Sequence, residues 1–329
     1  YKNGSLEESE AKHDTYYLYD IRGNLTYVLP PLAEGVTTQS VLDNLGYQYK
    51  YDHRNRLVEK KLPGKGWEYI VYDKQDRVVL TQDAQQRPTN TWLYTKYDIF
   101  GRVVYTGEYT GETNETTRKQ QQDKTNTYNS NNETKQATST TLNGTTIYYS
   151  NDAHPNTNIT VNTINYYDNY TFDKLGGNNP VSVYGQYTYG LNPNESNKGQ
   201  ATGSKTRILG TPVWITQVNY YKWKGQQLYS YTYNDLHQTT DKVSLKLDYV
   251  GKVQESTSVH QKTGSSTITT IDTFSYDHAG RLLAQDQKIN SQATERIASN
   301  TYNSLGQLIS KKVGNTAAKP LQNVDYKYN

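Results

Sequence analysis

The chain has 329 residues, a formal net charge of +3, 33 tyrosines and only 3 phenylalanines, and it contains no cysteine and no methionine. The lack of cysteine excludes disulfides, thiol catalysis and cysteine metal sites, and the small net charge excludes the basic footprint of a nucleic-acid or membrane-surface binder. With 33% hydrophobic residues and no run approaching the roughly 18 apolar residues of a membrane-spanning helix, tyrosine must supply much of the core, which favours an all-β protein without membrane insertion.

A seven-residue motif, Tyr-Asp-x-x-Gly-Arg-Leu or Val, recurs along the chain. Clear copies occupy residues 19–25, 51–57, 72–78, 97–103, 276–282 and 302–308, and weaker copies occupy residues 221–227 and 247–253. The later copies begin at residues 221, 247, 276, 302 and 328, in steps of 26, 29, 26 and 26 residues. Because the chain begins without methionine and ends just inside the last copy, we expect it to be a piece of a longer polypeptide.

The motif has the chemistry of a β-hairpin corner. Its acidic residue suits the first position of a type I turn, where the side chain accepts a backbone N–H two residues on. Three residues later the chain needs a left-handed conformation, which glycine adopts best and Asn or Asp tolerates. The turn-starting acids include Asp20, Asp52, Asp73, Asp98 and Asp277, and the left-handed slot holds Gly23, Asn55, Asp76, Gly101, Gly225, Gly251, Gly280 and Gly306.

This register predicts which flanking residues face each other. Tyr97 should lie opposite Val103, and Asp98 opposite Arg102 on the other face. We therefore expect a buried tyrosine row and an exposed row of turn-side ion pairs, with a repeated sugar or metal site as the alternative. The tyrosine row is Tyr19, Tyr51, Tyr72, Tyr97, Tyr276 and Tyr302, and the ion pairs are Asp52–Arg56, Asp73–Arg77, Asp98–Arg102 and Asp277–Arg281.

The middle of the chain interrupts the repeat. Residues 107–142 are rich in Thr, Asn, Gln, Lys and Glu, which indicates a solvated, partly flexible excursion or a polar binding surface. Strand-like patterns follow at residues 145–150 and 158–167. We therefore divide the chain into repeats at 1–109, a polar Asn/Thr-rich β insertion at 110–200, and repeats at 201–329. No segment predicts a convincing helix; residues 7–13 and 287–298 are weak candidates without strong caps.

No catalytic, cofactor or metal site is predicted. The six histidines lack metal-ligand spacing, and no nucleophile elbow, phosphate loop or dinucleotide fingerprint occurs. His53 and His278 fall in the variable turn positions, where exposure to solvent is expected. Tryptophans 67, 92, 214 and 223 are read as core residues of the sheet, with stacking on sugars as the open alternative.

The recurring Tyr-Asp-x-x-Gly-Arg motif resembles that of the bacterial YD-repeat, or RHS-repeat, family. Segments 199–203, 205–210, 214–221 and 321–326 resemble a bacterial RHS subfamily as well. The resemblance implies a sheet that spirals into a hollow β-shell, often around a toxin domain. The Asp-Pro-containing self-cleavage motif of the family has no match, since the chain contains no Asp-Pro.

The resemblance implies a structural, non-enzymatic shell segment, secreted or at the bacterial cell surface. Its partners would be other segments of the same polypeptide or an enclosed cargo domain, together with secretion machinery; some relatives use the type IX route. Two other functions stay open on the residues alone: an adhesin module that binds surface glycans, and a repeat-built polysaccharide-active enzyme.

Overall fold

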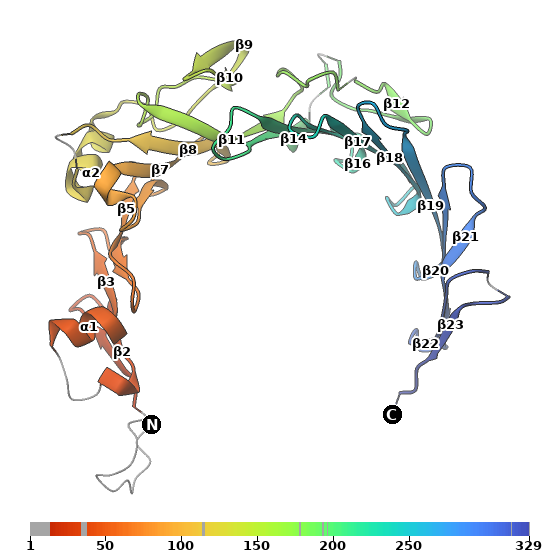
Figure 1. Ribbon diagram of the computed structural model, residues 1–329, viewed down its shortest axis with the longest axis horizontal. Helices are drawn as coiled ribbons and strands as arrows, with labels where there is room; N and C mark the ends of the chain where they lie inside the picture. The colour runs from red at the N-terminus through yellow and green to blue at the C-terminus, as the bar shows by residue number, and fades with distance from the viewer. Residues whose placement is uncertain are drawn as a thin grey trace, which may run out of the picture. The chain divides into compact units, whose positions relative to one another are not determined.

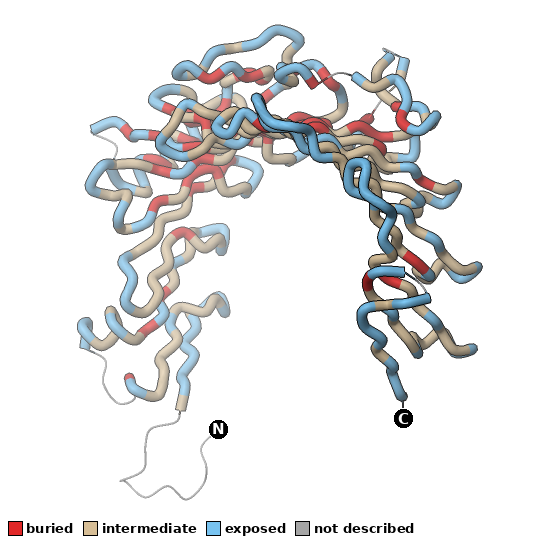
Figure 2. The backbone as a smooth tube through the Cα atoms, turned by 45° about the vertical axis from the view of Figure 1, so that its right-hand side comes forward, coloured by how far each residue is buried: buried red, intermediate tan, exposed pale blue. Residues whose placement is uncertain are grey.

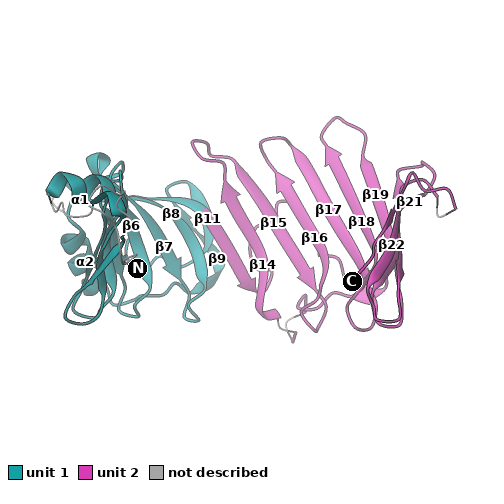
Figure 3. Ribbon diagram, turned by 90° about the horizontal axis from the view of Figure 1, so that it is seen from below, with its two compact units in different colours: residues 1–162 teal, residues 163–329 magenta. Residues whose placement is uncertain are grey.

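The computed structural model describes residues 14–33, 38–113, 116–177, 179–192, 194–195, 197–316 and 318–328. The chain forms two compact units, Tyr1–Asn162 and Thr163–Asn329, which Figure 3 colours separately. The boundary falls within strand β11 (Ile159–Asp168). Over the described residues, 19 strands belong to one large antiparallel sheet, so the predicted all-β fold of repeated hairpins is confirmed.

In unit 1 the strands follow one another along the chain, and each pairs antiparallel with the next (Figure 1). A separate hairpin follows them. The consecutive strands are β1 (Tyr16–Tyr19), β2 (Leu25–Leu29), β3 (Tyr47–Tyr51), β4 (Leu57–Lys61), β5 (Glu68–Tyr72), β6 (Val78–Gln82), β7 (Thr91–Tyr97) and β8 (Val103–Thr110), and the separate hairpin is β9 (Lys135–Leu142) with β10 (Thr145–Tyr149).

Unit 2 repeats the same arrangement with longer strands. Each pairs antiparallel with its sequence neighbour, and a short hairpin, β12 (Ser182–Val183) with β13 (Gln186–Tyr187), stands apart. The consecutive strands are β14 (Asn197–Arg207), β15 (Trp214–Tyr221), β16 (Gln227–Asn234), β17 (Thr239–Leu247), β18 (Val253–Lys262), β19 (Ile268–Tyr276), β20 (Leu282–Ile289), β21 (Glu295–Tyr302), β22 (Leu308–Val313) and β23 (Gln322–Asp325).

The core is small and rich in tyrosine. Along β7, Trp92, Tyr94 and Lys96 are buried while Leu93 is exposed, as the two-residue period of a strand requires. In Figure 2 buried positions gather on the strands around β7 and β8 in unit 1 and around β15 and β16 in unit 2. The largest fully buried side chains include Tyr94, Tyr105, Tyr109, Tyr149, Tyr166 and Tyr220.

Two short α-helices, α1 (Gln39–Leu45) and α2 (Arg118–Thr127), contradict the expectation that the chain has no helix. Helix α2 lies in the polar stretch that the composition marked as a flexible excursion, and it begins with a capping box of Thr117 and Gln120. Its Gln122 side chain accepts the Tyr72 N–H at 3.1 Å and donates to the Tyr72 carbonyl at 2.7 Å, which fastens the helix to β5.

The two weak helix candidates fare differently. Residues 287–298 form the end of β20 and the start of β21, and residues 7–13 lie outside the described residues. Single 3₁₀ turns occur at Pro31–Ala33 and Arg87–Thr89. Neither α-helix of the described chain has the length and apolar character that crossing a bilayer requires.

Candidate functional site

The repeated motif folds as a bulged hairpin corner. In the corner at residues 97–103, the N–H of Asp98 donates to the Arg102 carbonyl at 2.9 Å, and the N–H of Gly101 donates to the Asp98 carbonyl at 3.0 Å. The Asp98 carboxylate accepts the backbone N–H groups of Phe100 and Arg102 at 2.9 and 3.0 Å. Gly101 has a φ of 77°, and the strand register shifts at the corner, as in a β-bulge.

The same geometry recurs in both units. Tyr97 pairs with Val103, and Tyr276 with Leu282, as the register predicted. Asp20, Asp52, Asp73 and Asp277 each accept the backbone N–H two residues on at 2.9 Å. Every slot residue has a positive φ: Gly23, Asn55, Asp76, Gly101, Gly225, Gly251, Gly280 and Gly306.

Five of the motif tyrosines also bind the corner before them, and Tyr221 makes the same kind of bond to Ala201 on β14. The Tyr97 hydroxyl donates to the carbonyl of Val78, the last residue of the preceding motif, at 2.7 Å. The same bond repeats along the chain. The pairs are Tyr72 to Leu57, Tyr97 to Val78, Tyr221 to Ala201, Tyr276 to Val253, Tyr302 to Leu282 and Tyr328 to Leu308, all at 2.7–2.9 Å. We call this row of bonds the tyrosine ladder.

The motif cations reinforce the tyrosine ladder. The Arg77 guanidinium lies 4.6 Å from the centre of the Tyr97 ring and donates to the Asp98 carbonyl at 3.3 Å. Equivalent cation–ring contacts join Arg56 to Tyr72, Lys252 to Tyr276 and Arg281 to Tyr302. Neighbouring hairpins are therefore joined by side chains as well as by backbone pairing.

The expected burial of the two rows is wrong in unit 1. Asp73 is 2% exposed and Asp98 7%, whereas Tyr19 is 60% exposed. The two carboxylates are buried because the segment after α2 covers their corners: Arg77 donates to the Asn131 carbonyl at 2.7 Å, and the Glu133 N–H donates to the Tyr97 carbonyl at 2.8 Å.

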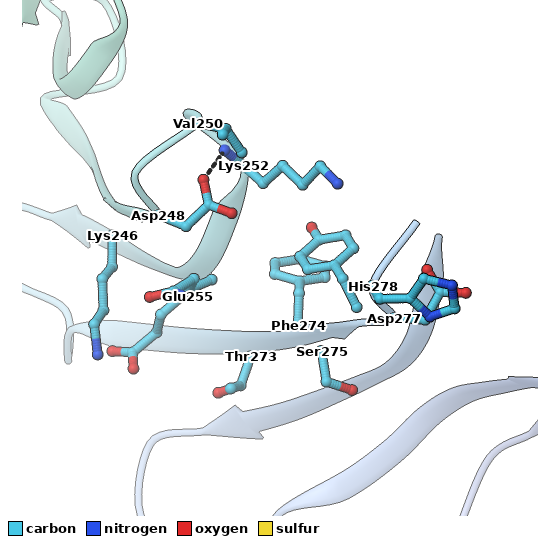
Figure 4. Close-up of a pocket in the computed structure, with 12 residues that line it drawn as sticks. Lys246, Asp248, Val250, Lys252, Glu255, Thr273, Phe274, Ser275, Asp277 and His278 are labelled. Carbon is cyan, nitrogen blue, oxygen red and sulfur yellow. Dashed lines mark hydrogen bonds between the residues drawn. The ribbon is translucent and has the colours of Figure 1, made fainter. Parts of the chain in front are cut away.

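A polar groove of about 490 Å³ opens beside one corner of unit 2 (Figure 4). This corner has Lys252 at the position that arginine holds in four of the clear copies. The Lys252 backbone N–H donates to the Asp248 carboxylate at 2.8 Å, but its ammonium lies toward the Tyr276 ring, 5.5 Å from the ring centre. Lys246 and His278 also line the groove. Carboxylates line it as well, from Asp248, Glu255 and Asp277, so the groove offers charges of both signs to a polar ligand.

The exposed aromatics Trp223 and Tyr249 lie at the corner before this one and at this corner itself. Trp223 is 70% exposed and Tyr249 88%, and the Lys224 ammonium lies 5.0 and 5.3 Å from their ring centres. Trp92, by contrast, is fully buried, and His53 and His278 are exposed at their turn positions. Within the described ranges, no cluster of three or more acidic or histidine side chains is arranged to hold a metal ion.

A buried polar cluster in unit 1 was not predicted from the sequence. The side chains of Lys96 on β7 and Glu133, between α2 and β9, are both fully buried and lie 2.7 Å apart. The Lys96 ammonium also donates to the side-chain oxygen of Asn151 at 2.6 Å and to the Ala153 carbonyl at 2.9 Å. The Tyr105 hydroxyl donates to the same Asn151 oxygen at 3.2 Å.

Glu133 is held by several further donors. Its carboxylate accepts the Ser150 hydroxyl at 2.6 Å and the N–H groups of Asp152 and Ala153 at 2.9 and 3.1 Å. Burial lowers the pKa of Lys96 to about 8, against the opposing effect of the Glu133 carboxylate. A fully buried amine and a fully buried carboxylate therefore meet the carboxamide of a partly buried asparagine.

One sequence signal pointed to this cluster. Lys96 follows Trp92 and Tyr94 at two-residue spacing, so a strand places all three side chains on one face. A lysine on a buried face needs an ionic or hydrogen-bonding partner. Its partners lie 37 and 55 residues further along the chain, in a stretch without motif spacing, so no sequence pattern identifies them.

Neither a family model nor a curated protein matches this chain. Among solved structures, one of TcdB2-TccC3-Cdc42 is 13% identical, covers 96% of this chain and 15% of its own, and has a TM-score of 0.33. One of TcdB2-TccC3-TEV is 14% identical, with coverages of 95% and 15% and a TM-score of 0.34. The chain thus spans about 15% of those chains. The resemblance to RHS-repeat proteins rests on the repeated motif.

Proposed function

We propose that this chain is a structural segment of an RHS-type β-shell. The observation that carries the proposal is the tyrosine ladder, in which the hydroxyls of Tyr72, Tyr97, Tyr276, Tyr302 and Tyr328 each donate to the carbonyl that ends the preceding corner. Contacts of this kind stabilise a hairpin only through its neighbours, as in repeat proteins whose units do not fold alone. A row of side chains that joins each hairpin to the one before it stabilises a sheet built from successive hairpins.

The shell encloses or presents another domain, and it does so outside the cytoplasm. Support for this part comes from the resemblance of the motif to that of RHS proteins. Fractionation of the producing cells tests the location: we expect the chain in the medium or accessible to protease on intact cells. Recovery only from the cytoplasm contradicts an exported shell.

Limited proteolysis of the polypeptide as the cell makes it tests enclosure. Trp92→Ala empties a fully buried site, which costs about 3–5 kcal/mol and opens the wall. Leu93→Ala, on the exposed face of the same strand, is the matched control. We expect the enclosed domain to be cut rapidly only in the Trp92→Ala protein. Equal rates of cutting in both proteins, with this chain still intact, contradict enclosure.

Glycan binding is a second candidate function, favoured by the corners that carry Trp223 and Tyr249. The two rings are exposed and Lys224 lies between them, an arrangement suited to stacking on a sugar and bonding its hydroxyls. Glycan arrays probed with the chain and its Trp223→Ala variant test it. Phe100→Ala, which removes an exposed turn aromatic of unit 1, is the control. Absence of binding by the unmodified chain at high concentration ends this candidate.

A further inference from the structure

We propose that unit 1 forms its own covalent cross-link, an isopeptide bond between the Lys96 amine and the Asn151 side-chain carboxamide, with Glu133 as the proton carrier. The three groups come from separate parts of the chain: β7, the segment before β9, and the segment after β10. The bond would be a modification site independent of whether the sheet encloses a cargo.

The geometry brings the reacting groups into contact. The Lys96 nitrogen lies 2.6 Å from the Asn151 carbonyl oxygen, so the carbonyl carbon is one bond, about 1.23 Å, beyond that oxygen. The same nitrogen lies 2.7 Å from the Glu133 carboxylate. Held groups of this kind react as if at very high concentration, because the entropy of bringing them together has been lost on folding.

The site also positions the groups that the reaction needs. The Tyr105 hydroxyl donates to the Asn151 oxygen at 3.2 Å, where negative charge develops when an amine attacks the carbonyl carbon. The Asn151 amide nitrogen donates to the Asn156 carbonyl at 2.8 Å, which fixes the orientation of the carboxamide. Tyr105 is itself fully buried, so water does not compete for its hydroxyl.

The steps balance without any further reactant. Glu133 takes one proton from the Lys96 ammonium, leaving a neutral amine and a carboxylic acid. The amine turns from the Asn151 oxygen to the carbonyl carbon and forms the new C–N bond. As the tetrahedral intermediate collapses, its bond to the original amide nitrogen breaks. That nitrogen receives the proton from Glu133. Glu133 then takes the second proton from the nitrogen of the attacking amine and passes it to the departing ammonia, so that ammonium leaves and the carboxylate is restored.

Burial favours the first of these steps. Both charges of the Lys96–Glu133 pair are taken out of water, which costs several kcal/mol per ion before their attraction is counted. Transfer of a proton between them removes both charges at once. The lowered pKa of Lys96, about 8, acts in the same direction because it favours the neutral amine.

Intact mass of the purified, denatured chain is the first test, and it needs no variant. We expect a mass below that of the sequence by one ammonia molecule, and after trypsin a branched peptide that joins Lys96 to Asn151. The full sequence mass after prolonged incubation of the folded protein would overturn the proposal. Loss of one water molecule would also overturn it, because that loss would make Glu133 the acceptor.

Variants separate the cross-link from other losses of ammonia. An asparagine can lose ammonia by closing on its own backbone, but that product persists in Lys96→Arg, whereas the isopeptide bond does not. We expect Lys96→Arg and Asn151→Ala to have the full mass. Glu133→Gln should slow the bond by about 10²–10⁴-fold, the usual share of general acid–base catalysis.

Lys205→Arg is the matched control. Lys205 is another buried lysine, on β14 of unit 2, and it pairs with Asp173 at 3.0 Å. We expect this variant to lose ammonia as the unmodified chain does. A mass deficit that survives in Lys96→Arg, or that disappears in Lys205→Arg, would contradict the assignment to Lys96 and Asn151.

Discussion

The corner at residues 72–78 in unit 1 and the corner at residues 276–282 in unit 2 have the same local geometry in different surroundings. Their Asp–Arg hydrogen bonds measure 2.8 and 2.6 Å. The Asp73 side chain is 2% exposed beneath the segment after α2, whereas that of Asp277 is 12% exposed and that of Arg281 is 30% exposed. The motif therefore fixes the shape of a corner, and the segment that covers it decides how strongly the ion pair affects stability.

The covering segment changes how much an ion pair contributes to stability, because water competes for exposed charges. An exposed ion pair contributes about 0–1 kcal/mol. A buried pair gains little over apolar packing, but loss of one partner leaves a charge in a place that water does not reach. The same substitution should therefore lower the free energy of unfolding by different amounts in the two corners.

The largest difference is expected for Asp73→Ala against Asp277→Ala. Asp73→Ala removes the acceptor of two backbone N–H groups and of the Arg77 guanidinium, and it should lower the free energy of unfolding by about 3 kcal/mol. Asp277→Ala removes the same contacts where water can replace them, and its effect should be clearly smaller. Urea unfolding of both variants measures the difference. Equal losses of unfolding free energy in the two variants would mean that the covering segment does not change the contribution of the ion pair.

Acid should weaken unit 1 through His154. Burial lowers the pKa of His154 to about 3, with help from the Lys124 and Lys96 charges. Since the unfolded chain takes up the proton near pH 6.5, stability is lost as pH falls from 6.5 toward 3. Between pH 6.5 and 4.5 this residue should cost about 2 kcal/mol.

Urea unfolding at those two pH values checks the acid effect. His154→Phe should make the difference between the two pH values smaller by about the same 2 kcal/mol. His260→Gln, which removes a half-exposed histidine of unit 2, is the control. Its free energy of unfolding should differ between the two pH values by the same amount as that of the unmodified chain. If His154→Phe shows the same difference in unfolding free energy between the two pH values as the unmodified chain, then His154 accepts its proton without unfolding.

The corners could be predicted from the sequence because their contacts are local. Asp98 and Gly101 lie three residues apart, and turn chemistry alone fixes their geometry. The segment that covers the corners of unit 1 could be predicted only in part. Thr117 and Gln120 form a capping box that signals the start of α2, but nothing in the sequence ties Asn131 to Arg77, 54 residues away. Contacts at that distance depend on the folded sheet, so the burial of the Asp–Arg row was missed.

The smallest effect should come from the left-handed slots. A Cβ at Gly101 would meet nothing within 4 Å, whereas one at Gly280 would meet the Lys252 side chain. Asn55 already occupies such a slot at a φ of 60°, so asparagine should be tolerated at both positions as far as the backbone is concerned. The backbone cost of Gly101→Asn and Gly280→Asn is then the same, and only the second moves Lys252.

The difference between these two variants therefore isolates one contact between neighbouring corners. Displacing Lys252 from the Tyr276 ring should make Gly280→Asn less stable than Gly101→Asn by about 0.5 kcal/mol, the strength of an exposed cation–ring contact. Urea unfolding of both variants in a Lys252→Met background provides the check, because the difference should vanish when the cation is absent. A difference that persists in that background would place the cost in the backbone of the Gly280 corner, and the corners of the two units would then differ in shape as well as in cover.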